Sequence, residues 1–120
     1  MNRPFISIII PVFNGSKTLE ATLQSIWNQS YEAREIIVID GGSNDGTVAL
    51  LEANAHRIDR WISEPDGGVY SAMNKGLQLA TGDWVYILGS NDKLASADVL
   101  EKVARQCDES VLLLFGHRSE

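Results

Sequence analysis

The chain alternates between short apolar runs and longer segments in which apolar residues recur at helical spacing. An apolar run without polar alternation is typical of a strand buried on both faces of a parallel sheet. Such runs predict five strands, over residues 5–10, 35–39, 60–63, 84–88 and 111–115. Pro11 follows the first run directly, and we expect it to end that strand.

The segments between these runs have the spacing of amphipathic helices. The clearest series is Leu19, Leu23, Ile26 and Trp27, at positions i, i+4, i+7 and i+8. Further helices are expected over residues 47–55, 69–80 and 97–107. Strict alternation of strand and helix predicts a mostly parallel, doubly wound, Rossmann-like α/β sheet of four to five strands, with helices on both faces.

The carboxyl ends of the predicted strands carry most of the acidic and glycine-rich loops. These loops are residues 11–14, 40–43, 64–68 and 89–92. Ligands of doubly wound sheets bind at this edge. Asp40 fits either an Asx turn or a hydrogen bond to a bound nucleotide, and the two roles can coexist. Asp66 and Asp92 fit either solvated turns or ligand contacts, with Asp92 a candidate ligand for a hard cation. Tyr70 and Asn74, four apart, fit either a shared pocket or ordinary helix positions.

Composition narrows the class of protein. With 120 residues the chain has room for one domain, and a net charge of −6 argues against sequence-independent nucleic-acid binding. The single cysteine, Cys107, excludes an intramolecular disulfide and favours a reducing compartment. The first apolar run is too short for a signal peptide. We therefore expect a cytoplasmic protein, with peripheral contact at the inner face of the membrane left open.

Several common sites are excluded by spacing. The loop over residues 41–47 has no lysine at a P-loop position and does not match GxGxxG, so it is neither a Walker A loop nor a dinucleotide fingerprint. The histidines, His56 and His117, have no candidate partner nearby in the sequence. A Ser-His-Asp or thiol nucleophile therefore cannot be argued, and Cys107 is expected to serve packing.

Four segments in register resemble the family 2 glycosyltransferases. They are SIIIPVFN at residues 7–14, IVIDGGSNDGT at 37–47, SEPDGGVYSAMNKG at 63–76, and the segment from TGDW to Asp92 at 81–92. Together they cover nearly the whole chain. The resemblance implies a GT-A fold, inverting transfer from a nucleotide-diphosphate sugar, and a divalent metal, Mg²⁺ or Mn²⁺.

The resemblance also implies roles for individual residues. Phe13 would form a platform for the nucleobase, and Gly41 stands where the family often has a second aspartate that pairs with uracil. Base recognition would then fall to backbone groups or to Asp40. Asp66 would approach the ribose or the metal-diphosphate region. The implied substrate-binding residues are Pro11, Val12, Phe13, Asn14, Asp40, Gly41, Asp66, Tyr70, Asn74, Ser90 and Asn91.

The family's metal motif, commonly Asp-x-Asp or a run ending in Asp-Asp, aligns with residues 89–92. Asp92 is the only carboxylate in this turn, and Asn91 offers an amide oxygen without charge. The resemblance therefore implies Asp92 as the metal ligand. With one anionic ligand instead of two, we expect weaker metal affinity that depends on the diphosphate of the donor.

The family domain is much longer than this chain, and its second half carries the acceptor site and an acidic catalytic base. We therefore expect residues 1–120 to be a single donor-binding region without the acceptor half, inactive in isolation, and no residue is assigned as the base. The implied function is transfer to a glycan or lipid-linked acceptor in cell-surface polysaccharide synthesis. The alternative is a non-catalytic nucleotide-binding or interaction module. A receiver-like signalling domain is disfavoured, because Lys93 follows the fourth strand and not the fifth.

The last apolar run, from Val111 to Phe115, bears on assembly. The resemblance implies that this strand lacks its usual neighbour, a later strand of the family domain. It would then either collapse against the fourth strand or pair with a second copy. We expect a homodimer through Val111–Phe115, with the helix over residues 97–107 also in the contact.

Overall fold

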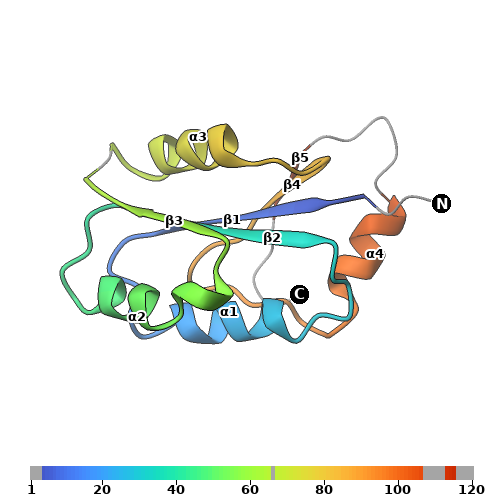
Figure 1. The fold of residues 1–120 in the computed structure, drawn as a ribbon, viewed down its shortest axis with the longest axis horizontal. Coiled ribbons are helices and arrows are strands. Elements are labelled where there is room, and N and C mark those ends of the chain that lie inside the picture. Colours follow the sequence, from blue (N-terminus) through green and yellow to red (C-terminus); the bar gives the residue numbers. More distant parts are fainter. Residues whose placement is uncertain (1–3, 66, 107–112, 116–120) are drawn as a thin grey trace.

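The computed structural model describes residues 4–65, 67–106 and 113–115 of the 120-residue chain. Strands and helices alternate along these residues (Figure 1). In chain order they are β1 (Ile6–Val12), α1 (Leu19–Trp27), β2 (Arg34–Asp40), α2 (Thr47–Ala53), the 3₁₀ turn η1 (Ala55–Arg57), β3 (Arg60–Ser63), α3 (Val69–Leu79), β4 (Trp84–Ile87), α4 (Val99–Gln106) and β5 (Leu113–Phe115).

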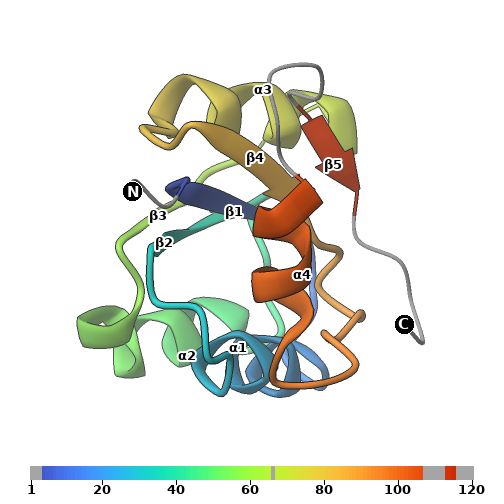
Figure 2. The same ribbon diagram turned by 90° about the vertical axis from the view of Figure 1, so that its right-hand side faces the viewer.

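The strands form one sheet in the order β3-β2-β1-β4-β5, and every neighbouring pair is parallel. Helices α1, α2 and α4 cover one face of the sheet, and α3 covers the other (Figures 1 and 2). The predicted parallel, doubly wound sheet with helices on both faces is therefore confirmed.

The central strand β1 is buried from both sides, as its unbroken apolar run predicts. Ile8 and Ile10 face the core beneath α1, where Leu23 is fully buried. Ile9 points to the opposite face and contacts α3 at Gly76. A Cβ at position 76 would lie 2.5 Å from Cγ2 of Ile9, so glycine is what allows α3 to approach the sheet this closely.

The prediction that Pro11 ends the first strand is wrong, because β1 continues to Val12. Pairing with β4 stops at Ile9, whose carbonyl accepts the last ladder bond from the N–H of Leu88 at 2.9 Å. The backbone groups of successive strand residues face opposite neighbours, so those of Pro11 face β4, as those of Ile9 do. Proline has no N–H to donate there, and the pairing with β4 ends. Pairing with β2 continues, through Pro11 opposite Ile39.

Of the two arrangements expected for the last strand, the structure shows the one in which it lies against the fourth strand. β5 pairs directly with β4 in parallel, with Val85 opposite Leu113 and Ile87 opposite Phe115. Val111 and Leu112 lie outside the described residues, as do Cys107 and His117. The expected homodimer stays a prediction. The helix predicted over residues 97–107 begins at Val99, two residues later than expected.

A buried polar cluster joins the strands at the sheet edge where they begin. The Glu35 side chain accepts hydrogen bonds from the Ser7 hydroxyl at 2.6 Å and from the backbone N–H of Thr81 at 2.7 Å. Burial raises the pKa of Glu35, but these hydrogen bonds and the nearby charge of Arg60 outweigh it and hold the pKa below its ordinary value. The carboxylate therefore stabilises the fold in its charged form.

None of the helices in the described part of the chain has both the length and the apolar character needed to cross a bilayer.

Candidate functional site

A cleft of about 320 Å³ opens at the carboxyl ends of β1 and β2, beside the N-terminal end of α3. Its lining residues are Pro11, Val12, Phe13, Gly41, Gly68, Val69 and Ala72. The first four are among the substrate-binding residues predicted from the sequence. The other three were missed, although a glycine-rich turn that opens a helix beside the predicted Tyr70 was the available signal.

The cleft is apolar and has an aromatic side chain at its mouth. Phe13 is 64% exposed and Val69 is 55% exposed, which is unusual for large apolar side chains. Gly41 and Gly68 line the cleft without side chains, so a ligand can come close to the backbone there. An exposed aromatic ring beside accessible backbone suits a planar ring that stacks on one face and hydrogen-bonds at its edge.

Asp40 does not reach this cleft with its carboxylate. The side chain is fully buried, and it accepts hydrogen bonds from the backbone N–H groups of Gly42 and Ser43 at 3.1 and 2.9 Å. The hydroxyl of Ser43 also donates to it, and that of Ser63 donates at 2.8 Å. Asp40 therefore takes the turn-forming role, in which it ties the loop after β2 to the end of β3.

The loop after β3 makes two further contacts, one with the loop after β2 and one with α3. Pro65 packs on Gly42, where a Cβ would lie 3.3 Å from the Pro65 Cα and where φ is +93°. The Glu64 carboxylate forms a 2.9 Å ion pair with Lys75 on α3. These contacts join the loop after β3 to the loop after β2 and to α3, next to the cleft.

The loops after β1 and β2 are joined by several cross-loop hydrogen bonds. Thr47 Oγ1 accepts from the N–H of Gly15 at 3.0 Å, and Asp45 accepts from the N–H of Ser16 at 3.2 Å. Asn14, predicted as substrate-binding, donates its N–H to Ser43 Oγ at 2.6 Å. Asn14 thus supports the loop that carries Phe13 and does not line the cleft.

The hydrogen bond from the Thr47 hydroxyl, together with those from Ser16 and from the Thr47 N–H, lowers the pKa of Asp45 to about 2. Asp45 is therefore ionised at neutral pH and accepts these bonds as a carboxylate. Neither Asp45 nor Thr47 was singled out from the sequence, where both read as ordinary residues at a helix start.

The turn after β4 carries the predicted metal ligand. The N–H of Asp92 donates to the carbonyl of Gly89 at 3.0 Å, which closes a tight turn. A Cβ at Gly89 would lie 2.8 Å from Oδ2 of Asp92 and 3.5 Å from Oδ1 of Asn91, so glycine leaves room for both side-chain oxygens. Ser90 lies against Gly15, which brings this turn to the same edge as the cleft.

This turn fits a hard cation that takes most of its oxygens from elsewhere. Asp92 supplies a carboxylate and Asn91 an amide oxygen, both acceptable to Mg²⁺ or Mn²⁺. No group of three His, Cys, Asp or Glu side chains comes together within residues 4–65, 67–106 and 113–115.

The other predicted residues lie away from the cleft. Tyr70 is 78% exposed and Asn74 is also exposed, and neither lines it. Ser90 and Asn91 belong to the turn after β4 and not to the cleft wall. Asp66 lies outside the described residues.

Comparison with known proteins gives concordant matches. The model of glycosyl transferase family 2 matches residues 7–118. A PGL/p-HBAD biosynthesis glycosyltransferase of Mycobacterium bovis is 43% identical over 107 residues, which are 87% of this chain and 42% of that protein. An uncharacterized glycosyltransferase of Haemophilus influenzae is 38% identical over 105 residues, 85% of this chain and 42% of that protein. The chain thus spans about two fifths of the length of these curated relatives.

Solved structures show the same fold. The mannosyltransferase PcManGT from Pyrobaculum calidifontis, in complex with GDP-Man and Mn²⁺, superposes with a TM-score of 0.83 at 28% identity, over 92% of this chain and 34% of that one. S. aureus TarS 1-349 in complex with UDP-GlcNAc gives 0.75 at 25% identity, over 83% and 30%. The GT-A-like fold implied by the sequence motifs is confirmed by these neighbours.

Proposed function

The chain belongs to glycosyl transferase family 2, and on that premise we propose that it is the donor-binding region of an inverting glycosyltransferase that uses a nucleotide-diphosphate sugar. One observation carries the proposal. The exposed Phe13 at the mouth of an apolar cleft shares a sheet edge with the turn that bears Asp92. A nucleoside diphosphate has the matching two ends, a flat base and an anionic diphosphate.

In this arrangement Phe13 and Val69 hold the nucleobase, while the absence of side chains at Gly41 and Gly68 lets its edge come close to the backbone. Asp40 does not contact the ligand in this arrangement. Its buried carboxylate instead holds the loops that form the cleft. The absence of an acidic side chain at Gly41 leaves base selection to the backbone. From the family resemblance we assign contacts with the ribose or the metal-diphosphate region to Asp66, which lies outside the described residues.

Asp92, assisted by Asn91 and Ser90, holds the metal-diphosphate end of the donor. A divalent cation, when bound, neutralises the negative charge that develops on the departing diphosphate. Two observations on relatives support this part of the proposal. PcManGT was solved with GDP-Man and Mn²⁺, and TarS 1-349 with UDP-GlcNAc.

The acceptor side is proposed from family membership alone. We place transfer on a glycan or lipid-linked acceptor in cell-surface polysaccharide synthesis, at the cytoplasmic side of the membrane. The similarity to a PGL/p-HBAD biosynthesis glycosyltransferase supports a biosynthetic role. No residue is assigned as the catalytic base. A second candidate, a nucleotide-binding module without turnover, is favoured by the single carboxylate of the turn after β4.

Isothermal titration calorimetry with uridine and guanosine diphosphates, with and without Mn²⁺, tests donor binding. We expect one of them to bind, and Mn²⁺ to tighten the binding. Phe13→Ala should weaken binding with and without Mn²⁺, whereas Asp92→Ala should remove only the effect of Mn²⁺. Leu77→Ala is the matched control, because Leu77 is an exposed apolar residue of α3 outside the cleft.

Two results would contradict the proposal. The first is that no nucleoside diphosphate binds at millimolar concentration. The second is that Phe13→Ala binds as tightly as Leu77→Ala. Release of sugar from a nucleotide-diphosphate sugar by the 120-residue chain would reject the module without turnover and favour the transferase.

A further inference from the structure

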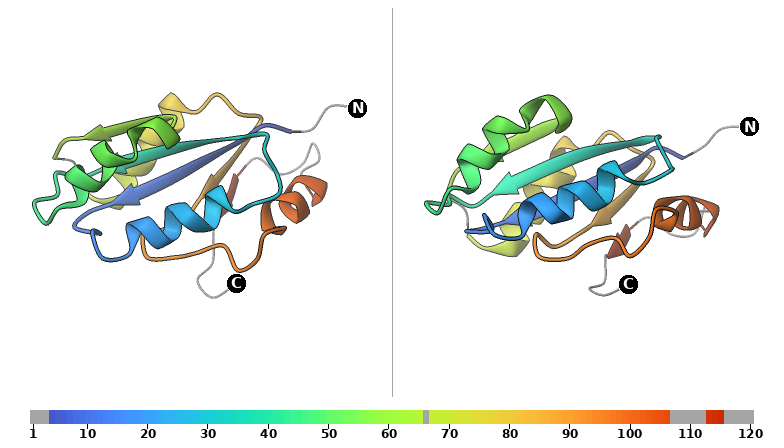
Figure 3. Two further views of the ribbon diagram at one scale, coloured as in Figure 1. Left: turned by 60° about the horizontal axis from the view of Figure 1, so that its bottom comes forward. Right: turned by 90° about the horizontal axis from the view of Figure 1, so that it is seen from below.

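The segment between β4 and α4 carries the Asp92 turn but has no regular secondary structure. Its backbone polar groups therefore need partners from elsewhere in the fold. This segment runs alongside α1 (Figure 3). Polar side chains on one stripe of α1 and just beyond its end bond to the segment's backbone at successive points.

The first of these side chains is Thr22, which is fully buried. Its Oγ1 lies 2.6 Å from the carbonyl oxygen of Asp92 and 2.8 Å from that of Ser90. A hydroxyl has a single proton, so it donates to one of these two carbonyls at a time or shares the proton between them, and the carbonyl of Thr18 lies farther away at 3.3 Å. Valine in its place would fill the same space and leave both carbonyls without that donor.

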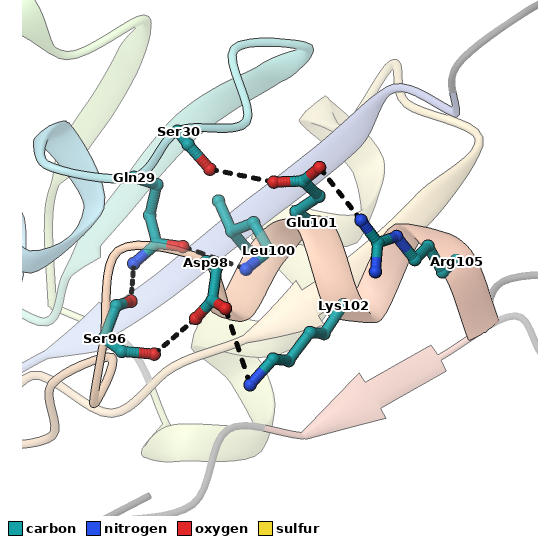
Figure 4. Close-up of polar contacts among 8 residues, drawn as sticks. All are labelled: Gln29, Ser30, Ser96, Asp98, Leu100, Glu101, Lys102 and Arg105. Carbon is teal, nitrogen blue, oxygen red and sulfur yellow. Dashed lines mark hydrogen bonds and ion pairs between the residues drawn. The ribbon is translucent and has the colours of Figure 1, made fainter.

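The later side chains act farther from the turn. Ser25 accepts the N–H of Leu94 at 3.1 Å. Gln29 donates to the carbonyl of Ser96 at 2.6 Å and accepts from the N–H of Leu100 at 2.9 Å (Figure 4). Gln29 therefore anchors the start of α4, whereas Thr22 is the one among these three side chains that bonds to the residues on either side of Asn91.

We propose that Thr22 is a positioning residue for the donor site: its hydroxyl fixes the backbone of Ser90 and Asp92 and thereby aims the Asp92 carboxylate at the metal-diphosphate end of the donor. This inference rests on the proposed function. Its physical basis is that, among the described residues, the pairing of β4 with β1 ends at Leu88 and its pairing with β5 ends at Ile87, before the turn begins. The side of the turn that faces the core is held by α1.

The test separates aiming from stability. Four variants are compared with the parent chain: Thr22→Val, Thr22→Ala, Thr22→Ser and Gln29→Met. Calorimetry gives the Mn²⁺ step, defined as the ratio of the nucleoside diphosphate Kd without Mn²⁺ to the Kd with Mn²⁺. Urea unfolding gives the stability of each variant. Broadening of the backbone amide signals of residues 89–93 by Mn²⁺ alone gives a readout that needs no nucleotide.

Loss of the Thr22 hydroxyl should shrink the Mn²⁺ step by about tenfold, as is typical for residues that orient a metal ligand. Thr22→Val and Thr22→Ala should both show this loss and keep the metal-free Kd of the parent, because the base cleft is untouched. Thr22→Ser should restore the step. Gln29→Met should be destabilised, since it loses the side-chain hydrogen bonds to the backbone of Ser25, Ser96 and Leu100, yet keep the step.

Two outcomes would overturn the inference while leaving the proposed function intact. In the first, the parent chain shows a Mn²⁺ step that both Thr22→Val and Thr22→Ala retain. In the second, the Mn²⁺ step of Gln29→Met falls as much, for the stability that it loses, as the step of the Thr22 variants does. The hydroxyl of Thr22 would then serve only the stability of the fold. A parent chain that binds no nucleoside diphosphate at all would overturn the proposed function and this inference with it.

Discussion

Replacing Thr47 by valine should loosen the loop that carries Phe13. Thr47 is fully buried, and its hydroxyl joins two loops by accepting the N–H of Gly15 at 3.0 Å and donating to Asp45 at 2.6 Å. Valine has nearly the same shape and a similar helix propensity, so packing and the start of α2 are preserved. The variant loses both hydrogen bonds, but the exposed Asp45 carboxylate can accept from water instead. The loss that costs stability is the acceptor for the buried N–H of Gly15.

The magnitude follows from that single loss. A buried N–H left without a partner costs about 1–3 kcal/mol, and we take about 2 kcal/mol for Gly15. For a domain of this size each kcal/mol lowers Tm by about 3–5 °C, so Thr47→Val should melt roughly 6–10 °C below the parent. Thr47→Ser keeps the hydroxyl and should retain most of the stability.

The assay pairs thermal unfolding with nucleoside diphosphate binding for both variants. Because Gly15 follows Phe13 closely in the same loop, Thr47→Val should also weaken binding, and Thr47→Ser should not. Equal melting temperatures and equal affinities for the two variants would refute the idea that this hydroxyl holds the loop.

Three further predictions concern metal binding, pH and assembly. Asn91→Asp should tighten Mn²⁺ binding by adding a second carboxylate beside Asp92, and an unchanged Mn²⁺ affinity would show that position 91 points away from the ion. The pKa of Glu35 is lower in the folded protein than in the unfolded chain, so its stabilisation is complete above the ordinary glutamate pKa of about 4.3 and is lost as pH falls through the folded value. Glu35→Gln should therefore lower the free energy of unfolding in urea at pH 7 and lower it much less in acid. A difference in unfolding free energy between parent and variant that stays constant with pH would contradict this. Sedimentation at micromolar concentration should show a homodimer that Leu113→Lys weakens, and a parent chain that sediments only as a monomer would contradict the expected pairing.

The alternation of strands and helices could be predicted from the sequence because apolar residues form continuous runs in the buried strands and recur at helical spacing in the helices. The apolar runs identified β1 to β4, and the series from Leu19 to Trp27 identified α1 within its observed bounds. The extension of β1 through Pro11 was not readable. It depends on which neighbour the missing N–H faces, and that is set by the pairing of β1 with β2 and β4.

The candidate site was predictable in its location and less so in its parts. Strand ends and glycine-rich loops pointed to the edge of the sheet where the cleft lies, and Phe13 lines that cleft. Val69 was missed because its place in the cleft depends on how α3 crosses the sheet. Thr22 was missed because a threonine within an amphipathic helix gives no sign of the distant turn that it holds.

The role of Asp40 illustrates a limit of motif reading. Sequence patterns leave open whether a carboxylate at the end of a strand faces a ligand or its own loop. Here the neighbouring serines decide, because Ser43 and Ser63 both donate to it and leave it fully buried. The motif around it therefore supports the cleft, and the surface that we propose to face the ligand is formed by Phe13 and the two glycines that line the cleft.

The most direct test of the central claim is a map of backbone amide chemical shifts as a nucleoside diphosphate is added to the ¹⁵N-labelled chain. We expect the largest chemical-shift changes at the amides of Phe13, Gly41 and Val69. The amides of the turn around Asp92 should shift only when Mg²⁺ is also present. A second cavity, of about 550 Å³, lies between α1 and residues 93–97 and offers a built-in comparison. Shifts confined to that cavity, or no shifts at all, would contradict the assignment of the donor site.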